Sequence, residues 1–279
     1  MSDAAQITQT LAVILPVLYC AASLLYAMHF GGSMAPVVRL PRRLVVVLAL
    51  GAHLALLTTH ALTSRSFPAS EFWTTTSVVA FGLGLLYIFT RRRVEDEGAG
   101  FLVFGVVALM QLCASAFGPL EPRPVGASAD FLSISHATTS VLAGSAVMLS
   151  GLHGSLYLLV LRRMRRGSFG PLVEHMPDLR TLALLTRRAA LAGFLLLSVG
   201  VNLGIAWAHA TDVAGFGYTD RWVLAMFVLW IHFGIVAFSR SIRGFSAQRA
   251  SFAAAVGLAI FLIAGLVSLL PHGSFHWAS

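Results

Sequence analysis

Long runs of apolar residues, separated by short polar segments, set the pattern of the chain. Eight such runs lie approximately at 8–30, 44–63, 73–90, 101–118, 136–160, 189–208, 222–239 and 251–270. A helix needs about 20 apolar residues to cross a bilayer, and each run reaches that length or comes close to it. The pattern therefore predicts an all-α, polytopic integral membrane protein, with eight transmembrane helices that form one domain over residues 1–279.

Glycine and proline mark the expected ends of these helices. The first run ends at Gly31 and Gly32, and we expect Pro41 to lie in the loop before the second run. Pro177 is expected to end another segment, because proline lacks the N–H that a continuing helix needs. Beyond it, residues 178–186 are predicted to form a short, separate amphipathic helix on the membrane surface.

Composition favours a membrane protein over a soluble one. Hydrophobic residues make up 57% of the chain and charged residues only 11%, whereas about a quarter of the residues of a soluble domain are charged. The net charge is +8, and all nineteen basic residues are arginine. These arginines lie in the short connections between runs rather than along one solvated face, so they do not indicate nucleic-acid binding.

The arginines alternate from one connection to the next. Sixteen lie in the first, third, fifth and seventh connections, and the other three are Arg65, Arg123 and Arg221. Under the positive-inside rule, the arginine-rich connections face the cytoplasm. We therefore expect both termini on the outer, extracytoplasmic side of the cell's inner (cytoplasmic) membrane. The start of the chain lacks the basic segment of a cleaved signal peptide, which favours a first transmembrane helix.

Two features predict how the helices pack and what covers them. Gly200 and Gly204 lie one helical turn apart in the sixth run, and small residues at such spacing let membrane helices approach closely. The longest outer connection, 119–135, holds three prolines among its first six residues. Because these prolines cannot continue a helix, we expect the connection to form a cap over the outer end of the bundle.

The histidines are concentrated from mid-membrane outward. A helix rises about 1.5 Å per residue, so sequence position converts to depth. His53 and His232 then lie near mid-depth, His60 lies near the outer end of its run, and His136 heads the fifth run on the outer side. Three further histidines follow the sixth and eighth runs on that side: His209, His272 and His276.

Such histidines could bind the iron of heme, because neutral imidazole is a good ligand for it. A bis-histidine site needs two imidazoles from different helices, one on each face of the porphyrin. His53 and His60 are seven residues apart on one helix face, so they cannot bind the same iron, although each could join a different site. A histidine at a helix end is often only interfacial, and we favour that interpretation over ligation for His209 and His272. His29 and His153 are expected to reach from their helices to the inner membrane boundary.

Other chemistries receive less support from the sequence. It contains no HExxH, no phosphate-binding glycine loop followed by lysine and no Gly-x-Ser-x-Gly elbow. No acidic residue lies within a predicted run, which argues against a cation-coupled transporter. Cys20 and Cys113 lack the spacing of a covalent heme site. We therefore expect non-covalent heme b and no catalytic turnover.

Several segments together resemble a known family. The run headed by His136 ends LYLLVLRRMRR, the segment MPDLRTLALLTRR precedes a glycine- and phenylalanine-containing span, and the chain ends HGSFHWAS. In these features the sequence resembles the CcsA/CcmC/HemX group of heme-handling membrane proteins, the cytochrome c assembly protein family. The resemblance covers most of the chain and is most specific over 136–276.

The resemblance implies particular heme ligands. By position, His136 and His276 would bind heme iron at the outer surface, with His276 fitting that role better than His272. His53 matches the histidine of the family's second helix and would ligate a membrane-embedded heme. His232, also near mid-depth, is the candidate partner of His53.

Two departures place the chain nearer one branch of the family. The tryptophan-rich heme-presenting motif is expected just before the seventh run, where the chain reads AGFGYTDRW. Asp220 fits the aspartate of that motif and is a candidate heme-contacting residue, whereas Gly217 and Thr219 stand where tryptophans are expected. Phe238 occupies the position where the family often has a second membrane histidine. Both losses indicate the HemX-like branch, which lacks the motif.

Three functions stay open at this point. The first is a heme-binding, heme-handling membrane protein of cytochrome c biogenesis, whose partners are heme, the lipid bilayer and a cytochrome c assembly or heme-biosynthesis protein, without nucleic acid. The second is a HemX-like, non-catalytic regulator or scaffold of tetrapyrrole biosynthesis, acting through the inner connection 162–188. The third is a b-type electron-transfer subunit, which would need two bis-histidine sites across the membrane.

Overall fold

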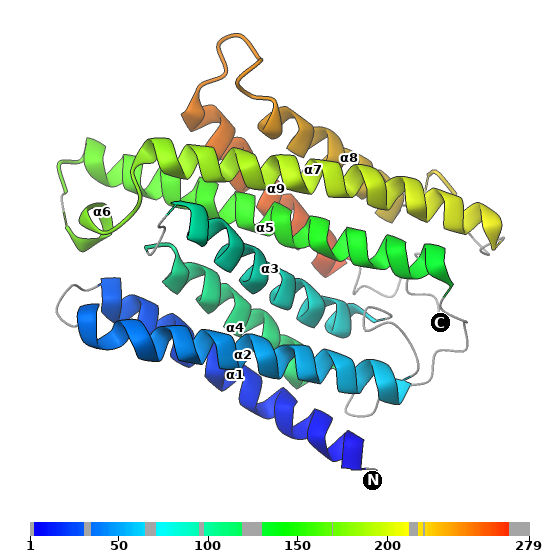
Figure 1. The fold of residues 1–279 in the computed structure, drawn as a ribbon. Helices are drawn as coiled ribbons and strands as arrows, with labels where there is room; N and C mark the ends of the chain where they lie inside the picture. Colours follow the sequence, from blue (N-terminus) through cyan, green and yellow to red (C-terminus); the bar gives the residue numbers. More distant parts are fainter. Residues whose placement is uncertain are drawn as a thin grey trace. The chain divides into compact units, whose positions relative to one another are not determined.

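The fold consists of helices throughout the part of the chain that the structure, a computed structural model, describes (Figure 1). That part comprises residues 3–30, 35–64, 71–94, 98–118, 130–168, 170–211, 217–219 and 221–267. Within it the helices are α1 (Asp3–Phe30), α2 (Ala35–Ser64), α3 (Phe72–Val94), α4 (Gly100–Phe117), α5 (Phe131–Arg165), α6 (Pro171–Glu174), α7 (Leu179–Ala210), α8 (Arg221–Ala237) and α9 (Ala247–Val267). The predicted all-α fold is confirmed, and a helix occurs at each of the eight apolar runs.

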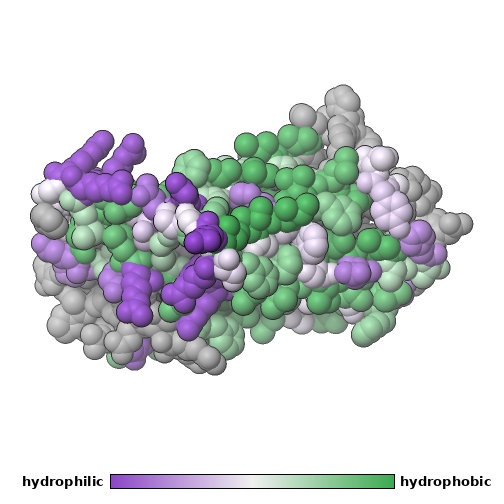
Figure 2. All heavy atoms as spheres, turned by 90° about the horizontal axis from the view of Figure 1, so that it is seen from above, coloured by the Kyte–Doolittle hydropathy of each residue, from purple (hydrophilic) through white to green (hydrophobic). Residues whose placement is uncertain are grey.

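The long helices have the length and surface of membrane spans. Within the described part of the chain, seven helices are long and apolar enough to cross a bilayer. Helix α8 adds a shorter apolar segment, Val223–Ala237. Large apolar side chains are exposed along these helices, for example Leu195, Val228 and Ile231. Figure 2 shows hydrophobic residues over a broad area of one face, with hydrophilic residues gathered mostly at one end. Lipid chains would cover such a surface.

Contacts divide the chain into two compact units. Unit 1 comprises Met1–Ser128 and Val160–Asp178, and so contains α1 to α4 and α6. Unit 2 comprises Ala129–Leu159 and Leu179–Ser279, and so contains most of α5 together with α7, α8 and α9. The expectation of a single domain stays a prediction.

Aromatic rings fill one part of the interior of unit 1. Tyr26 of α1 stacks on Phe104 of α4 with ring centroids 5.3 Å apart, and Tyr87 of α3 meets Phe104 edge to face at 5.7 Å. Gly100 lies directly against the Tyr26 ring, which a side chain at that position would overlap. Arg42 is fully buried beside them, with its guanidinium carbon 4.7 Å from the centroid of the Tyr26 ring. Such a cation–π contact partly compensates a charge removed from water.

Close approaches at glycine hold unit 2 together. A Cβ on Gly154 of α5 would lie 2.6 Å from the carbonyl oxygen of Ser251 in α9, and one on Gly200 of α7 would lie 3.0 Å from the Ser140 hydroxyl of α5. These distances show that only glycine lets the helix backbones pack this closely. The prediction that Gly200 and Gly204 permit close helix contact is confirmed.

Prolines are less disruptive than the sequence analysis predicted. Pro41 does not lie in a loop: α2 begins at Ala35 and runs through it. Proline removes one backbone hydrogen bond, but membrane helices tolerate this loss where neighbouring groups compensate it. For the same reason Arg42, expected in a cytoplasmic loop, is instead part of α2 and reaches the interior of unit 1.

Two helix boundaries also differ from the predictions. Residues 178–186 do not form a separate surface helix, because α7 runs unbroken from Leu179 to Ala210. Residues 179–192 contain no glycine or proline that could interrupt this helix. Helix α5 begins at Phe131, so His136 lies in its second turn rather than at its head. The expected cap therefore ends by residue 130, and its residues 119–129 lie outside the described part of the chain.

Candidate functional site

His136 is held in a defined orientation by one face of α7. Its Nδ1 lies 2.8 Å from the carbonyl oxygen of Gly200. Because a carbonyl only accepts hydrogen bonds, Nδ1 carries the proton and donates it, which leaves the imidazole lone pair on Nε2. A histidine that ligates a metal through one nitrogen usually has its other nitrogen fixed in this way.

The spacing of residues along α7 explains this geometry. Gly200, Gly204 and Trp207 recur at intervals of four and three residues and so share one helix face. A Cβ on Gly204 would lie 2.7 Å from Nδ1 of His136, so the imidazole occupies the space that glycine leaves. The Trp207 ring lies nearly parallel to the imidazole, with centroids 6.4 Å apart and an interplanar angle of 14°. This face of α7 thus supplies a hydrogen-bond acceptor, a gap and an aromatic wall.

His53 belongs to a chain of buried hydrogen bonds that links the four long helices of unit 1. The Tyr19 hydroxyl of α1 lies 2.9 Å from Nδ1 of His53, and Nε2 of His53 lies 3.0 Å from the Ser77 hydroxyl of α3. Ser77 donates to Gln111 Oε1 of α4 at 2.8 Å. The Gln111 amide donates to Ser115 at 3.1 Å, and Ser115 donates back to the α1 backbone at Ala12, 2.7 Å away.

The direction of this chain fixes the state of His53. Since the Ser77 hydroxyl proton goes to Gln111, Ser77 must accept the proton of His53 Nε2. Nδ1 of His53 then carries the lone pair and accepts from Tyr19. Both ring nitrogens are therefore used, and ligation of iron by either would displace Tyr19 or Ser77. The assignment of His53 as a heme ligand stays a prediction.

His60, two turns along α2 from His53, has a contrasting environment. Both of its ring nitrogens are buried and make no hydrogen bond within the described part of the chain. A buried polar atom without a partner is rare and needs an explanation, such as a ligand. The sequence placed His60 near the outer end of its helix but gave no sign that its nitrogens are buried without partners.

The remaining predicted residues fall into two groups. His232 of α8 donates from Nε2 to the carbonyl oxygen of Ala253 in α9 at 2.7 Å, so it ties two helices of unit 2 together, and its pairing with His53 stays a prediction. His153 is buried and bonds the carbonyl of Leu149, 2.9 Å from its Nδ1, rather than reaching toward the membrane boundary as predicted. Three predicted residues lie outside the described part of the chain: Asp220, His272 and His276.

The donor set suits heme better than a bare metal ion. No group of three or more histidine, cysteine, aspartate or glutamate side chains that could hold a metal ion occurs in the described ranges. Heme iron needs only one or two axial protein ligands, because the porphyrin supplies the other four. His136, with its tautomer fixed beside a tryptophan, and His60, whose ring nitrogens have no partner among the described residues, are the imidazoles whose chemistry fits such a ligand.

Together these features define an all-helical membrane protein that carries histidines within and beside its spans. The chain belongs to the cytochrome c assembly protein family, whose family model matches residues 20–274. It is 26% identical over 229 residues to Protein HemX of Brevibacillus brevis, an alignment covering 77% of this chain and 81% of that protein. It is 22% identical over 248 residues to Cytochrome c biogenesis protein CcsA of Guillardia theta, covering 80% of this chain and 81% of that protein. The resemblance read from the sequence is confirmed.

Proposed function

We propose that this chain binds non-covalent heme b through neutral imidazoles and handles it, without catalytic turnover, in cytochrome c biogenesis at the cytoplasmic membrane. The observation that carries this proposal is the arrangement at His136, whose Nδ1–H is fixed by Gly200 so that the lone pair lies on Nε2. Membership of the cytochrome c assembly protein family supports the same function. The relative from Guillardia theta is itself named for cytochrome c biogenesis.

At the outer site, His136 and His276 would together hold one heme. Gly200 would hold the His136 ring in register, and the Trp207 ring beside it would exclude water from the porphyrin edge. Bound heme would supply a redox-active iron whose potential depends on these ligands and on burial. Asp220, close in sequence to α8, is proposed to contact the same heme. We propose with it that both termini face the outer side of the membrane.

In unit 1 we propose His60 as the ligand that is best prepared to bind a second heme. Within the described part of the chain its buried nitrogens have no hydrogen-bond partner, whereas those of His53 already accept and donate hydrogen bonds. Ligation would satisfy one of these nitrogens at no cost in existing bonds. The candidates for the embedded site from the sequence are His53 and His232. To bind iron, His53 would have to lose a hydrogen bond to Tyr19 or Ser77, and His232 would have to bind it while its Nε2 is bonded to Ala253.

The outer site is tested by heme content. The protein is purified in detergent, and heme is quantified per polypeptide from its absorption spectrum in the wild type, His136→Ala and His209→Ala. We expect His136→Ala to lose most of the outer heme and to alter the low-spin spectrum. His209, which lies 3.0 Å from the Tyr218 hydroxyl at the end of α7, serves as the control and should retain wild-type heme. Unchanged heme in His136→Ala would refute the assignment, and a heme-free protein that co-purifies with a heme-biosynthetic enzyme would favour the regulatory alternative.

The site at His60 is tested by separating ligation from stability. His60→Ala removes no side-chain hydrogen bond to any residue that the structure describes. The free energy of unfolding should therefore change by less than about 1 kcal/mol, while the heme bound per polypeptide should fall. Thr58→Ala, a neighbouring change at a residue that bonds only the Leu54 carbonyl of its own helix, is the matched control. Equal heme content in both variants would exclude His60 as a ligand.

A further inference from the structure

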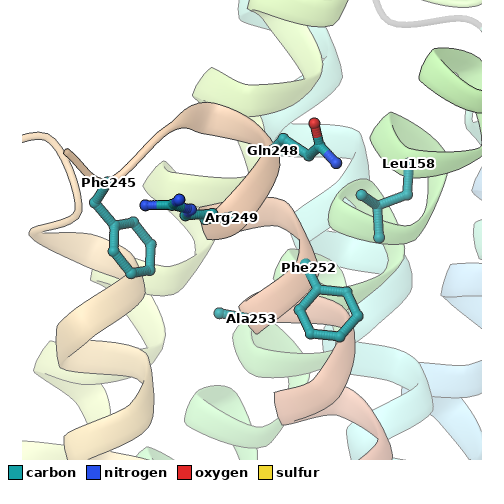
Figure 3. Close-up of a pocket in the computed structure, with 6 residues that line it drawn as sticks. All are labelled: Leu158, Phe245, Gln248, Arg249, Phe252 and Ala253. Atoms are coloured by element: carbon teal, nitrogen blue, oxygen red, sulfur yellow. The ribbon is translucent and has the colours of Figure 1, made fainter. Parts of the chain in front are cut away.

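A cavity lies in unit 2, in the turn region between α8 and α9 (Figure 3). It has a volume of about 430 Å³ and is lined by Leu158 of α5, by Phe245 of the turn and by four residues of α9: Gln248, Arg249, Phe252 and Ala253. None of these six is a histidine, cysteine or methionine, so the cavity offers no iron ligand. Its lining residue Ala253 accepts the hydrogen bond of His232, but neither His136 nor His60 lines the cavity.

The lining changes from polar to apolar along α9. Gln248 and Arg249 are exposed in the first turn of the helix, and Phe252 and Ala253 follow one turn later. In Figure 3 the Arg249 side chain extends toward Phe245, and the Gln248 amide lies on the side of Leu158. A cavity with a polar mouth and an apolar wall fits a molecule that has both a headgroup and a hydrocarbon part.

The polar mouth is strongly cationic. Gly244 adopts a φ of 78°, which only glycine adopts readily, and its carbonyl oxygen accepts a hydrogen bond from Arg249 Nη1 at 2.9 Å. That bond holds the guanidinium in place and leaves most of its five donors for another acceptor. Arg240 and Arg243 belong to the same turn, and the segment 239–252 contains no aspartate or glutamate. An anion is therefore the complementary charge.

The apolar wall continues as an exposed stripe. Phe252 is 61% exposed, and Val256, Ala259 and Ile263 are exposed at the following turns of α9. These residues recur every three or four positions and so lie on one face of the helix. An extended hydrocarbon chain could follow this stripe away from Arg249.

We propose that this cavity binds an anionic phospholipid of the arginine-rich, predicted cytoplasmic leaflet. The phosphate would be held by the Arg249 guanidinium and the Gln248 amide, since arginine donates paired hydrogen bonds to phosphate oxygens. The first part of an acyl chain would lie against Phe252, Leu158 and Ala253, and its remainder would follow the stripe on α9. Basic pockets beside membrane helices on the cytoplasmic side recognise anionic headgroups in this way. The proposal is independent of heme binding.

The test compares lipid retention in native mass spectra of the full chain. Protein in detergent is titrated with phosphatidylglycerol or, separately, with phosphatidylcholine. The wild type should retain phosphatidylglycerol in preference, and Arg249→Gln should weaken that binding about fivefold, the effect of losing one cationic contact near a membrane surface. Phe252→Ala, a change at an exposed residue, should weaken retention of both lipids. Arg180→Gln, at an exposed arginine in the first turn of α7 outside the cavity, should match the wild type.

Several results would overturn the proposal. One is equal retention of the two lipids by the wild type. Another is an equal loss in Arg249→Gln and Arg180→Gln, which would indicate a diffuse effect of positive charge. A third is a fall in heme content in Arg249→Gln with lipid retention unchanged, which would assign the cavity to heme carboxylates instead.

Discussion

Replacing Gln111 by leucine is expected to lower the free energy of unfolding by about 2 kcal/mol, because buried partners left without hydrogen bonds are costly. Gln111 is the centre of the chain that runs from Tyr19 through His53 and Ser77 and returns to α1. Leucine fills a similar volume but neither accepts from Ser77 nor donates to Ser115. Reversible unfolding in mixed detergent micelles would measure the change.

The control for this experiment is Asn202→Leu. The Asn202 amide is exposed on α7 and donates only to the Ser198 carbonyl of the same helix, at 2.7 Å. Its replacement should change the free energy of unfolding by less than about 0.5 kcal/mol. Losses of the same size in the two variants would show that the buried chain does not stabilise unit 1.

Gly204→Ala is expected to weaken heme binding at the outer site about tenfold, the usual scale for disturbing a residue that orients a ligand. The added methyl would lie 2.7 Å from the His136 ring, so the imidazole must turn away from α7 and lose its bond to Gly200. Titration of the heme-depleted protein with hemin, followed by absorbance, measures the affinity.

Gly51→Ala provides the matched comparison. It is also a helical glycine in a predicted span, but a Cβ there would meet no atom within 4 Å, so hemin affinity should be unchanged. Wild-type affinity in Gly204→Ala would mean that the orientation of His136 by α7 is irrelevant to binding.

The helices could be predicted from the sequence because their signal is simple. About twenty apolar residues in a row can satisfy their backbone groups in a bilayer only as a helix, and among the described residues a helix occurs at every predicted run. Helix boundaries were harder to predict, because a residue that disfavours a helix can be included when the neighbouring turns stabilise it. Pro41 was expected in the loop before the second run, yet α2 begins at Ala35 and includes it. The segment after Asp178 was separated from α7 on polarity alone, although no residue in it breaks a helix.

The histidines show the limit of the same reasoning. Position along a run predicted the depth of His53 and His136 in the membrane. It does not predict which atoms surround an imidazole. His53 proved to be a hydrogen-bonded link between helices, whereas the ring nitrogens of His60, on the same helix face, have no partner among the described residues. That distinction depends on Tyr19 and Ser77, which belong to other helices than His53. The spacing of residues along the sequence does not predict contacts between such helices.

The central claim, that neutral imidazoles of this chain hold heme, is tested most directly by the absorption spectrum of the detergent-purified wild-type protein, recorded oxidised and then reduced. A low-spin, b-type spectrum, with heme extractable by acidified solvent because it is not covalently attached, is the expected result. A protein that purifies without heme and whose spectrum does not change when hemin is added would contradict the claim.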